Sequence, residues 1–343
     1  TRKESSAASD VYKRQVIAVA PALGPTVGGA ILNASSWHFI FWCMVPLLVL
    51  VLAAGIKLLA NVGDPRDTPL DVPSVILSAL AFGGLVYALS SMGKAVEGAA
   101  TLPLIVGIVG VVALVVFVRR QNRLARENRA LLDFSPFKVR NYTLAVAVML
   151  LSFGLMLGSV TVLPIYLQSA LGVSALVTGL VVMPGGLLQG VISPFVGRIF
   201  DARGPRPLLI PGSIMFAAGV WLMTLLGQDS KVWMVVGMHV LFAVGMGMMM
   251  TPLMATALAS LPNEYYGHGS AIMNTLQQLA GATGTAFLVV FLTRGTQAGQ
   301  DAGLDVAAAT SQGTSWAFLF AGVVSLAVVA LAPLLKPVRG AKA

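Results

Sequence analysis

"PALGPTVGGAILNASSWHFIFW", residues 21–42, places two prolines and three glycines inside an apolar run of the kind that crosses membranes. Proline removes a backbone hydrogen bond from a helix, and glycine costs a helix about 1 kcal/mol relative to alanine. Glycines spaced along one face nevertheless let two helix backbones approach closely, and proline fixes a bend. The stretch therefore predicts a bent helix that packs tightly against another helix.

The composition of the whole chain indicates an integral membrane protein. The chain is 57% hydrophobic with a mean hydropathy of +0.86, and only 10% of its residues are charged, against roughly 25% in soluble domains. Because lipid offers no partners to bare backbone groups, each membrane span of about 20 apolar residues should be a helix. We expect an all-α protein of about ten transmembrane helices, at 16–34, 37–59, 72–92, 101–118, 142–168, 174–196, 207–226, 232–260, 269–293 and 313–335.

The positions of lysine and arginine predict the orientation of these spans. With residues 1–15 on the inside, 19 of the 22 basic residues fall on inner segments, and only Lys94, Lys231 and Arg294 fall outside. Basic residues favour the cytoplasmic side of membrane proteins. We therefore expect a multi-pass protein of the plasma (inner) membrane with both ends in the cytoplasm. The net charge of +9 then reflects topology and contact with anionic lipid, and no nucleic-acid partner is expected.

Two polar segments interrupt the apolar pattern. Residues 1–15 form a polar leader that is either disordered or non-native, and residues 336–343 form a short cytoplasmic tail. The segment "RRQNRLARENRALLDFSPFKVRNY", residues 119–142, carries arginines at intervals of about three. Residues 119–141 are either a solvated basic linker or an amphipathic, lipid-sensing helix that lies on the inner leaflet.

The opening stretch resembles a known signature. Gly24, Pro25, Gly28 and Gly29 form the pattern G-P-x-x-G-G. This pattern, with the following "SSWHFIFW", is similar to the antiporter motif in the fifth span of drug:proton antiporters of the major facilitator superfamily, in the fourteen-span branch of multidrug exporters. That family usually begins the motif with another glycine, where this chain has Ala20. The resemblance implies a tight contact near the outer face with the counterpart helix of the other half.

Two further stretches resemble the same branch. "GRIFDARGPRP", residues 197–207, is similar to the family's charged cytoplasmic loop, which implies a gating role for Gly197, Asp201, Arg203, Gly204 and Arg206. Arg203 and Arg206 are offset from the usual basic positions, and a topology-setting charge is the alternative. Residues 267–286 resemble the thirteenth-span motif, although Gln277 stands where arginine is common.

The resemblance also implies a domain plan. Residues 16–59 would be the last two spans of the amino-terminal bundle, 72–118 two extra spans, 119–141 the linker and 142–335 a six-span carboxy-terminal bundle. The chain would then lack spans one to four, which hold the acidic residues and the arginine that this family is thought to use for proton coupling. The upstream coding sequence is the observation that would test this expectation.

Polar residues inside spans are the candidates for a substrate cavity. No acidic residue lies at the centre of a predicted span, so the chain has no evident proton relay of its own. His239 is the only deep titratable side chain, and it is either cavity-linked or a packing residue. Uncharged polar side chains within spans avoid lipid and face the protein interior. About half of these candidates should only form hydrogen bonds to neighbouring helices and line no cavity. The cavity candidates are Ser159, Thr161, Gln189, His239, Asn274, Gln277 and Gln278.

The function implied by the resemblance is proton-coupled efflux of amphipathic drugs or antibiotics by alternating access. The expected partners are the lipid bilayer, small amphipathic substrates and protons, with the proton gradient as driving force and no cofactor. With Cys43 alone and only three scattered histidines, neither a catalytic residue nor a metal site is evident. The alternatives are a membrane-embedded enzyme and a non-transporting receptor or assembly subunit.

Overall fold

A computed structural model describes residues 27–32, 34–58, 71–92, 101–127 and 129–336. Within these ranges, nine helices are long and apolar enough to cross a membrane, and no strand is present. The long helices are α2 (Trp37–Leu58), α3 (Val72–Ser90), α5 (Thr101–Ala125), α6 (Arg140–Ser169), α7 (Ala175–Arg203), α8 (Arg206–Met223), α9 (Val232–Ala259), α10 (Tyr266–Asp301) and α11 (Val306–Leu331). Short 3-10 turns occupy Ser135–Lys138, Asn263–Tyr265 and Ala332–Leu334.

Nine of the ten predicted spans correspond to these helices, and an all-α fold is confirmed. Most of the tenth predicted span, 16–34, lies outside the described residues. Its described residues are 27–32 and 34, and they are helical. The predicted boundaries at 293 and 313 are wrong because α10 and α11 continue toward each other through residues of low hydropathy. Gly295 packs against Gly313 and Gly299 against Ala309, so close backbone contact stabilises helix where hydropathy is weak.

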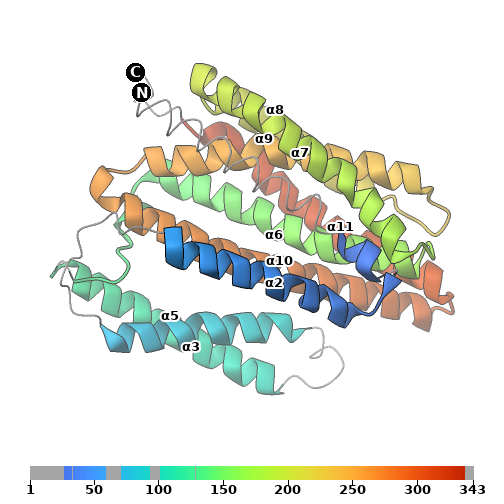
Figure 1. Ribbon diagram of the computed structural model, residues 1–343, viewed down its shortest axis with the longest axis horizontal. Helices are drawn as coiled ribbons and strands as arrows, with labels where there is room; N and C mark the ends of the chain where they lie inside the picture. The colour runs from blue at the N-terminus through green and yellow to red at the C-terminus, as the bar shows by residue number, and fades with distance from the viewer. Residues whose placement is uncertain (1–26, 33, 59–70, 93–100, 128, 337–343) are drawn as a thin grey trace.

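Helices α6 to α11 form one bundle (Figure 1). Helix α10 packs along α6 and α11, and α9 packs along α7 and α8. Helices α6 and α10 cross closely, since a Cβ on Gly158 would lie 2.9 Å from the Gly284 carbonyl oxygen. Around these crossings Tyr142, Tyr166 and Phe216 are fully buried. Small residues therefore bring the helices together, and aromatic side chains fill the remaining space.

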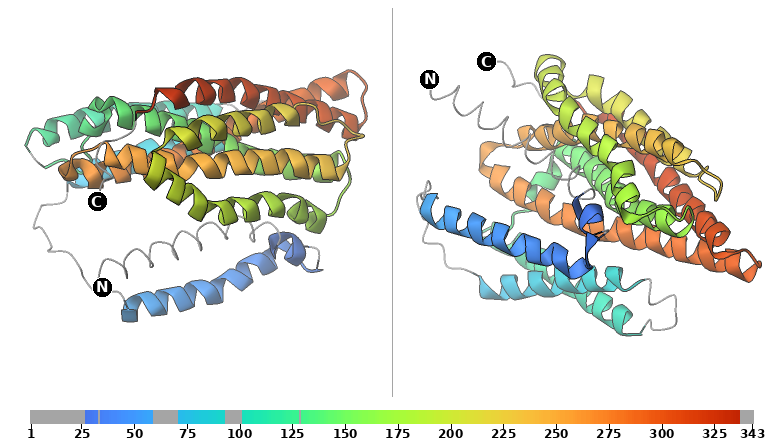
Figure 2. Two further views of the ribbon diagram at one scale, coloured as in Figure 1. Left: turned by 90° about the horizontal axis from the view of Figure 1, so that it is seen from above. Right: turned by 45° about the vertical axis from the view of Figure 1, so that its right-hand side comes forward.

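Helices α3 and α5 form an antiparallel hairpin beside this bundle, and α3 contacts α10. Gly84 and Gly110 meet at the crossing of the two hairpin helices, where a Cβ on Gly84 would lie 3.1 Å from the Gly110 Cα. Helix α2 is different, because it has no buried residue (Figure 2). Its side chains are available to lipid or to further helices.

The contacts between helix ends define two ends of the molecule. At one end Tyr142 donates a hydrogen bond to the Gly269 carbonyl (2.8 Å), and Arg206 donates one to the Leu335 carbonyl (3.1 Å). We call this the basic end, because the described Lys and Arg residues gather there except Lys231 and Arg294. At the opposite end Tyr166 donates to the Gly227 carbonyl (2.7 Å).

Residues 119–125 are the last turns of α5. The alternative of a separate amphipathic helix lying on the membrane is therefore wrong for this part of the 119–141 segment. The helix simply continues past its apolar part, because arginine, glutamine and leucine are good helix formers and no glycine or proline intervenes. Its arginines project from the basic end of the hairpin.

Candidate functional site

The antiporter-like motif makes one close backbone contact in the described part of the chain. A Cβ on Gly29 would lie 2.5 Å from the Ala175 carbonyl oxygen and 3.3 Å from the Leu176 Cα, at the first turn of α7. No atom of a described residue lies within 4 Å of a Cβ built on Gly28. Gly24 and Pro25 lie outside the described residues. The close approach therefore belongs to Gly29 rather than to Gly28.

The residues predicted to form a gating loop lie mostly on a helix. Gly197, Asp201 and Arg203 are in the last turns of α7, so their placement on a loop is wrong. Gly204 ends the helix with φ of 76°, a conformation that glycine adopts without strain, and its N–H bonds the Phe200 carbonyl (2.8 Å). Arg206 starts α8 and ties it to Leu335.

Asp201 is exposed and has no ion pair among the described residues. A carboxylate near a helix C-terminus is disfavoured by the helix dipole, by roughly 0.3–1 kcal/mol. Its position is therefore not explained by the stability of α7.

The seven cavity candidates separate into two sets. Ser159 and His239 are buried inside the bundle, and the Ser159 Oγ and the His239 Nδ1 have no hydrogen-bond partner among the described residues. The His239 ring packs on Gly185 of α7, whose Cβ would lie 2.8 Å from the imidazole Cδ2. Asn274 and Gln278, in contrast, are exposed on α10.

The remaining candidates take intermediate positions. The Thr161 hydroxyl donates a hydrogen bond to the Leu157 carbonyl one turn earlier (3.1 Å), which satisfies it within α6. Gln189 of α7 packs its Cγ against Gly247 of α9, and Gln277 is partly exposed. The structure therefore distributes the seven side chains over four helices, and the two cavities described below are lined by other residues.

A continuous set of hydrogen bonds, which we call the polar chain, joins the hairpin to the bundle at the basic end. Arg120 of α5 donates two hydrogen bonds to Asp71, from Nε (2.8 Å) and from a terminal nitrogen (2.7 Å). Ser74 donates to the same carboxylate and accepts from the Gln121 amide (2.6 Å). Gln121 Oε1 then accepts from the backbone N–H of Leu132 (3.0 Å).

The polar chain ends on α10. The backbone N–H of Asp133, next to Leu132, donates a hydrogen bond to His268 Nδ1 (3.3 Å). At the other end of the chain, the Arg120 guanidinium and the Ser74 hydroxyl hold the pKa of the Asp71 carboxyl well below its ordinary value of 3.8. The ion pair therefore stabilises the fold at every pH above the ordinary pKa of the carboxyl group. This stabilisation is lost as the pH falls through the lowered pKa.

We expect Gln121→Leu to destabilise the junction of hairpin and bundle. Gln121 is fully buried, and its loss leaves the Leu132 N–H without an acceptor, at a cost of roughly 1–3 kcal/mol. Thermal unfolding in detergent should show a lower midpoint than wild type. Gln297→Leu makes the same change at an exposed position of α10 and should leave the midpoint nearly unchanged. Equal midpoints for both variants would contradict a structural role for the polar chain.

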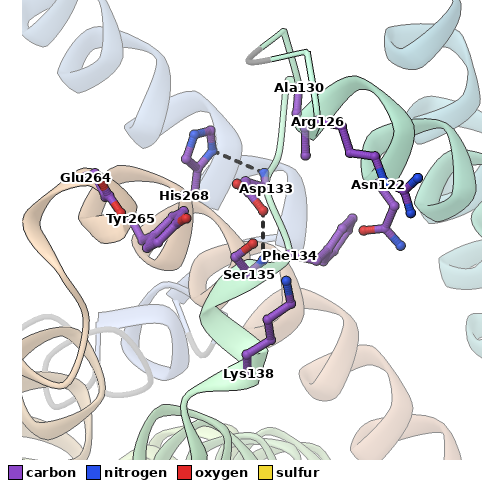
Figure 3. Close-up of a pocket in the computed structure, with 11 residues that line it drawn as sticks. Asn122, Arg126, Ala130, Asp133, Phe134, Ser135, Lys138, Glu264, Tyr265 and His268 are labelled. Carbon is purple, nitrogen blue, oxygen red and sulfur yellow. Dashed lines mark hydrogen bonds between the residues drawn. The ribbon is translucent and has the colours of Figure 1, made fainter.

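Two cavities border the hairpin. A polar one of about 870 Å³ opens at the basic end (Figure 3). An apolar groove of about 730 Å³ lies between the hairpin and α10, and its only side-chain hydroxyl, on Thr283, is bonded within α10. The groove is lined by Leu85, Ala88, Leu89, Met92, Pro103, Leu104, Gly107, Ile108, Val111, Val112, Leu279 and Thr283.

Comparison with known proteins identifies the family. The family model described as Major Facilitator Superfamily matches residues 16–285. The chain belongs to the major facilitator superfamily. The resemblance to the major facilitator superfamily, which the motifs indicated, is therefore confirmed.

Several relatives carry names that describe drug resistance or efflux. Lincomycin resistance protein LmrB of Listeria monocytogenes is 41% identical over 283 residues, which cover 82% of this chain and 59% of that protein. Multidrug efflux pump LfrA of Mycolicibacterium smegmatis is 31% identical over 79% of this chain and 53% of its own length. The chain thus spans between half and two thirds of the length of these relatives.

The sequence alone did not reveal the polar chain. Asp71 was visible as an acidic residue at the start of a span, but its partner Arg120 is one arginine of several in its segment. Gln121 and His268 carry no local signal, since their partners lie at Ser74, Leu132 and Asp133. The two adjacent amides Gln121 and Asn122 within a basic helix end were the only available hint.

Proposed function

We propose that this chain supplies the carboxy-terminal bundle, the extra hairpin and part of the amino-terminal bundle of a proton-coupled exporter of amphipathic drugs. The observation that carries this proposal is the backbone contact of Gly29 with Ala175, because it joins the antiporter-like motif to the first turn of α7. The names of the relatives, lincomycin resistance protein and multidrug efflux pump, support the substrate class. The same proposal places the protein in the plasma membrane with the basic end in the cytoplasm.

Alternating access supplies the mechanism in this proposal. Two helix bundles rock about a binding site between them, and contacts at one end open as those at the other end close. The Gly29–Ala175 contact would be part of the closure at the outer end. Asp201, which lacks a partner among the described residues, would pair across the inner end in one of the two states. Exposed Asn274 and Gln278 would then face the substrate path.

The test is transport by the chain joined to whatever coding sequence lies upstream of it. In proteoliposomes with an imposed pH gradient, we expect uptake or extrusion of lincomycin or of a fluorescent cationic dye that a protonophore abolishes. The 343-residue chain by itself should insert but should not transport, because alternating access needs two bundles and, among the described residues, α2 buries none of its side chains. Proton-dependent flux by this chain alone would contradict the need for a second bundle. Drug binding without flux in the longer protein would favour a receptor instead.

We expect Asp201→Asn to slow the transport cycle about tenfold while leaving equilibrium drug binding close to wild type. The residue lies at the end of α7, far from the middle of the bundle, so it acts on the change of state rather than on the ligand. Initial efflux rates and drug-binding isotherms separate the two effects. Asp229→Asn, an exposed acid at the opposite end, is the matched control and should transport normally. A large loss of affinity with normal turnover would contradict the gating role.

A further inference from the structure

The polar cavity at the basic end has three walls. The first is the end of α5, the second is the segment 130–138 that leads into α6, and the third is the start of α10 with the short turn before it. The second and third walls are joined by the hydrogen bond from Asp133 to His268. Within the second wall, Asp133 Oδ1 accepts from the Ser135 N–H (2.8 Å). The cavity therefore lies where the hairpin joins the bundle, and hydrogen bonds hold two of its walls in place.

Two cations line this cavity and are unpaired. The side chains of Arg126 and Lys138 make no ion pair or hydrogen bond with any described residue. Figure 3 shows that they reach the cavity from different walls, Arg126 beside Asn122 and Lys138 below Ser135. A guanidinium and an ammonium on separate walls can contact one anion from two sides, which strengthens the charge-assisted hydrogen bonds that they donate.

Neutral donors complete the lining. Because His268 Nδ1 accepts the Asp133 N–H, the neutral imidazole carries its proton on Nε2 and offers it as a donor. The Asn122 amide and the Tyr265 hydroxyl also line the cavity and can donate. An anion with several oxygen acceptors would satisfy such a set of groups.

Two acids also line the cavity. The Asp133 carboxylate is partly satisfied by the Ser135 N–H, and Glu264 is exposed on the wall opposite Arg126 (Figure 3). Outside the cavity lining, Arg119, Arg123, Arg129 and Arg140 are exposed and have no ion pair among the described residues, so the nearby sequence stays positive. Arg120 is the exception, because Asp71 neutralises it.

We propose that this cavity binds a phosphate group, and that its source is the headgroup of an anionic lipid of the inner leaflet. The cavity lies where α5 and α10 leave the apolar core at the basic end, which the positive-inside pattern places at the cytoplasmic surface. The negative surface potential of that leaflet raises the local concentration of anionic headgroups beside it. A soluble phosphate compound shares the same chemistry, so the experiment includes both sources.

The first arm measures lipid retention. The purified chain is exchanged into detergent that contains phosphatidylglycerol, and bound lipid is counted by native mass spectrometry. We expect wild type to retain one phosphatidylglycerol that Arg126→Gln/Lys138→Gln loses, with affinity reduced about tenfold for each cation removed. Arg119→Gln/Arg123→Gln also removes two positive charges, but from positions of α5 that do not line the cavity, and this variant should retain the lipid. Equal retention by the two double variants would overturn the proposal.

The second arm of the experiment tests a substitution that should strengthen lipid binding instead of weakening it. Glu264→Gln removes a carboxylate from the cavity wall and should strengthen retention of phosphatidylglycerol. Weaker retention would overturn recognition of a simple anion. Glu264, Arg126 and Lys138 are all exposed, so thermal unfolding in lipid-free detergent should be unchanged, which separates loss of binding from loss of folding.

The third arm distinguishes the two sources. Inorganic phosphate is titrated while the unfolding midpoint is followed, with sodium chloride at equal ionic strength as reference. A midpoint unchanged by phosphate, together with the lipid results above, assigns the site to lipid. A rise in the midpoint that Arg126→Gln/Lys138→Gln removes supports phosphate recognition from either source. Absence of both lipid retention and a phosphate effect would overturn the proposal.

Discussion

Gly29→Leu is expected to reduce transport by the proposed exporter at least tenfold without preventing membrane insertion. The first atom of the new side chain would already lie 2.5 Å from the Ala175 carbonyl oxygen, and the remaining atoms would have to pass the backbone at Leu176. Backbone cannot move aside as a flexible side chain can, so the helix carrying Gly29 must separate from α7. If this contact closes the outer end, the closed state is lost and the cycle stops. Initial rates of dye efflux from loaded cells measure the effect.

Gly28→Leu is the matched control for this substitution. It makes the same change one residue earlier, where a Cβ meets nothing within 4 Å. Its transport rate should stay within about twofold of wild type, as expected for a substitution away from a packed contact. Equal damage from the two variants would indicate a general intolerance of bulk in this segment. Unchanged transport in Gly29→Leu would remove the basis of the proposed closure.

Gly284→Leu should prevent the bundle from folding. A Cβ at this position would overlap the Gly154 carbonyl of α6, and Gly158 packs on the same turn of α10 from the next turn of α6. The two helices would have to move apart along their whole contact, which costs more than the roughly 1–3 kcal/mol of ordinary overpacking. We expect little monodisperse protein in size-exclusion chromatography and a strongly lowered unfolding midpoint.

Gly267→Leu provides the comparison on the same helix. Gly267 is exposed near the start of α10, and a Cβ there meets nothing within 4 Å. Leucine also has a higher helix propensity than glycine, so this variant should be as stable as wild type or slightly more so. A folded, monodisperse Gly284→Leu protein would show that the α6–α10 crossing can be repacked.

Much of the fold could be predicted from the sequence because lipid imposes one secondary structure on every long apolar run. The start of α9 at Val232 and the span of α2 follow directly from hydropathy. The signal weakens where helices leave the apolar layer. Residues 119–125 and the facing ends of α10 and α11 are helical for reasons of propensity and packing, which hydropathy does not report.

The candidate site was less predictable. A motif gives the residues that share a helix, but not the rotation of that helix, so it could not distinguish Gly29 from Gly28. Polarity within a span likewise did not distinguish buried Ser159 from exposed Asn274, because both are uncharged and both avoid lipid in principle. The polar chain was missed because Gln121 bonds residues distant in sequence on both sides.

The polar chain has a consequence for how many bodies would move in the proposed exporter. It joins the α3–α5 hairpin to the start of α10, and α3 also packs along α10. We infer that the hairpin and the six-helix bundle move together as one rigid body. The two extra spans would then enlarge one of the two moving bundles. They would not add a third moving body or a further hinge between the bundles. Spin labels on α3 and α10 should keep one distance throughout the cycle, while the distance from either helix to α2 takes two values.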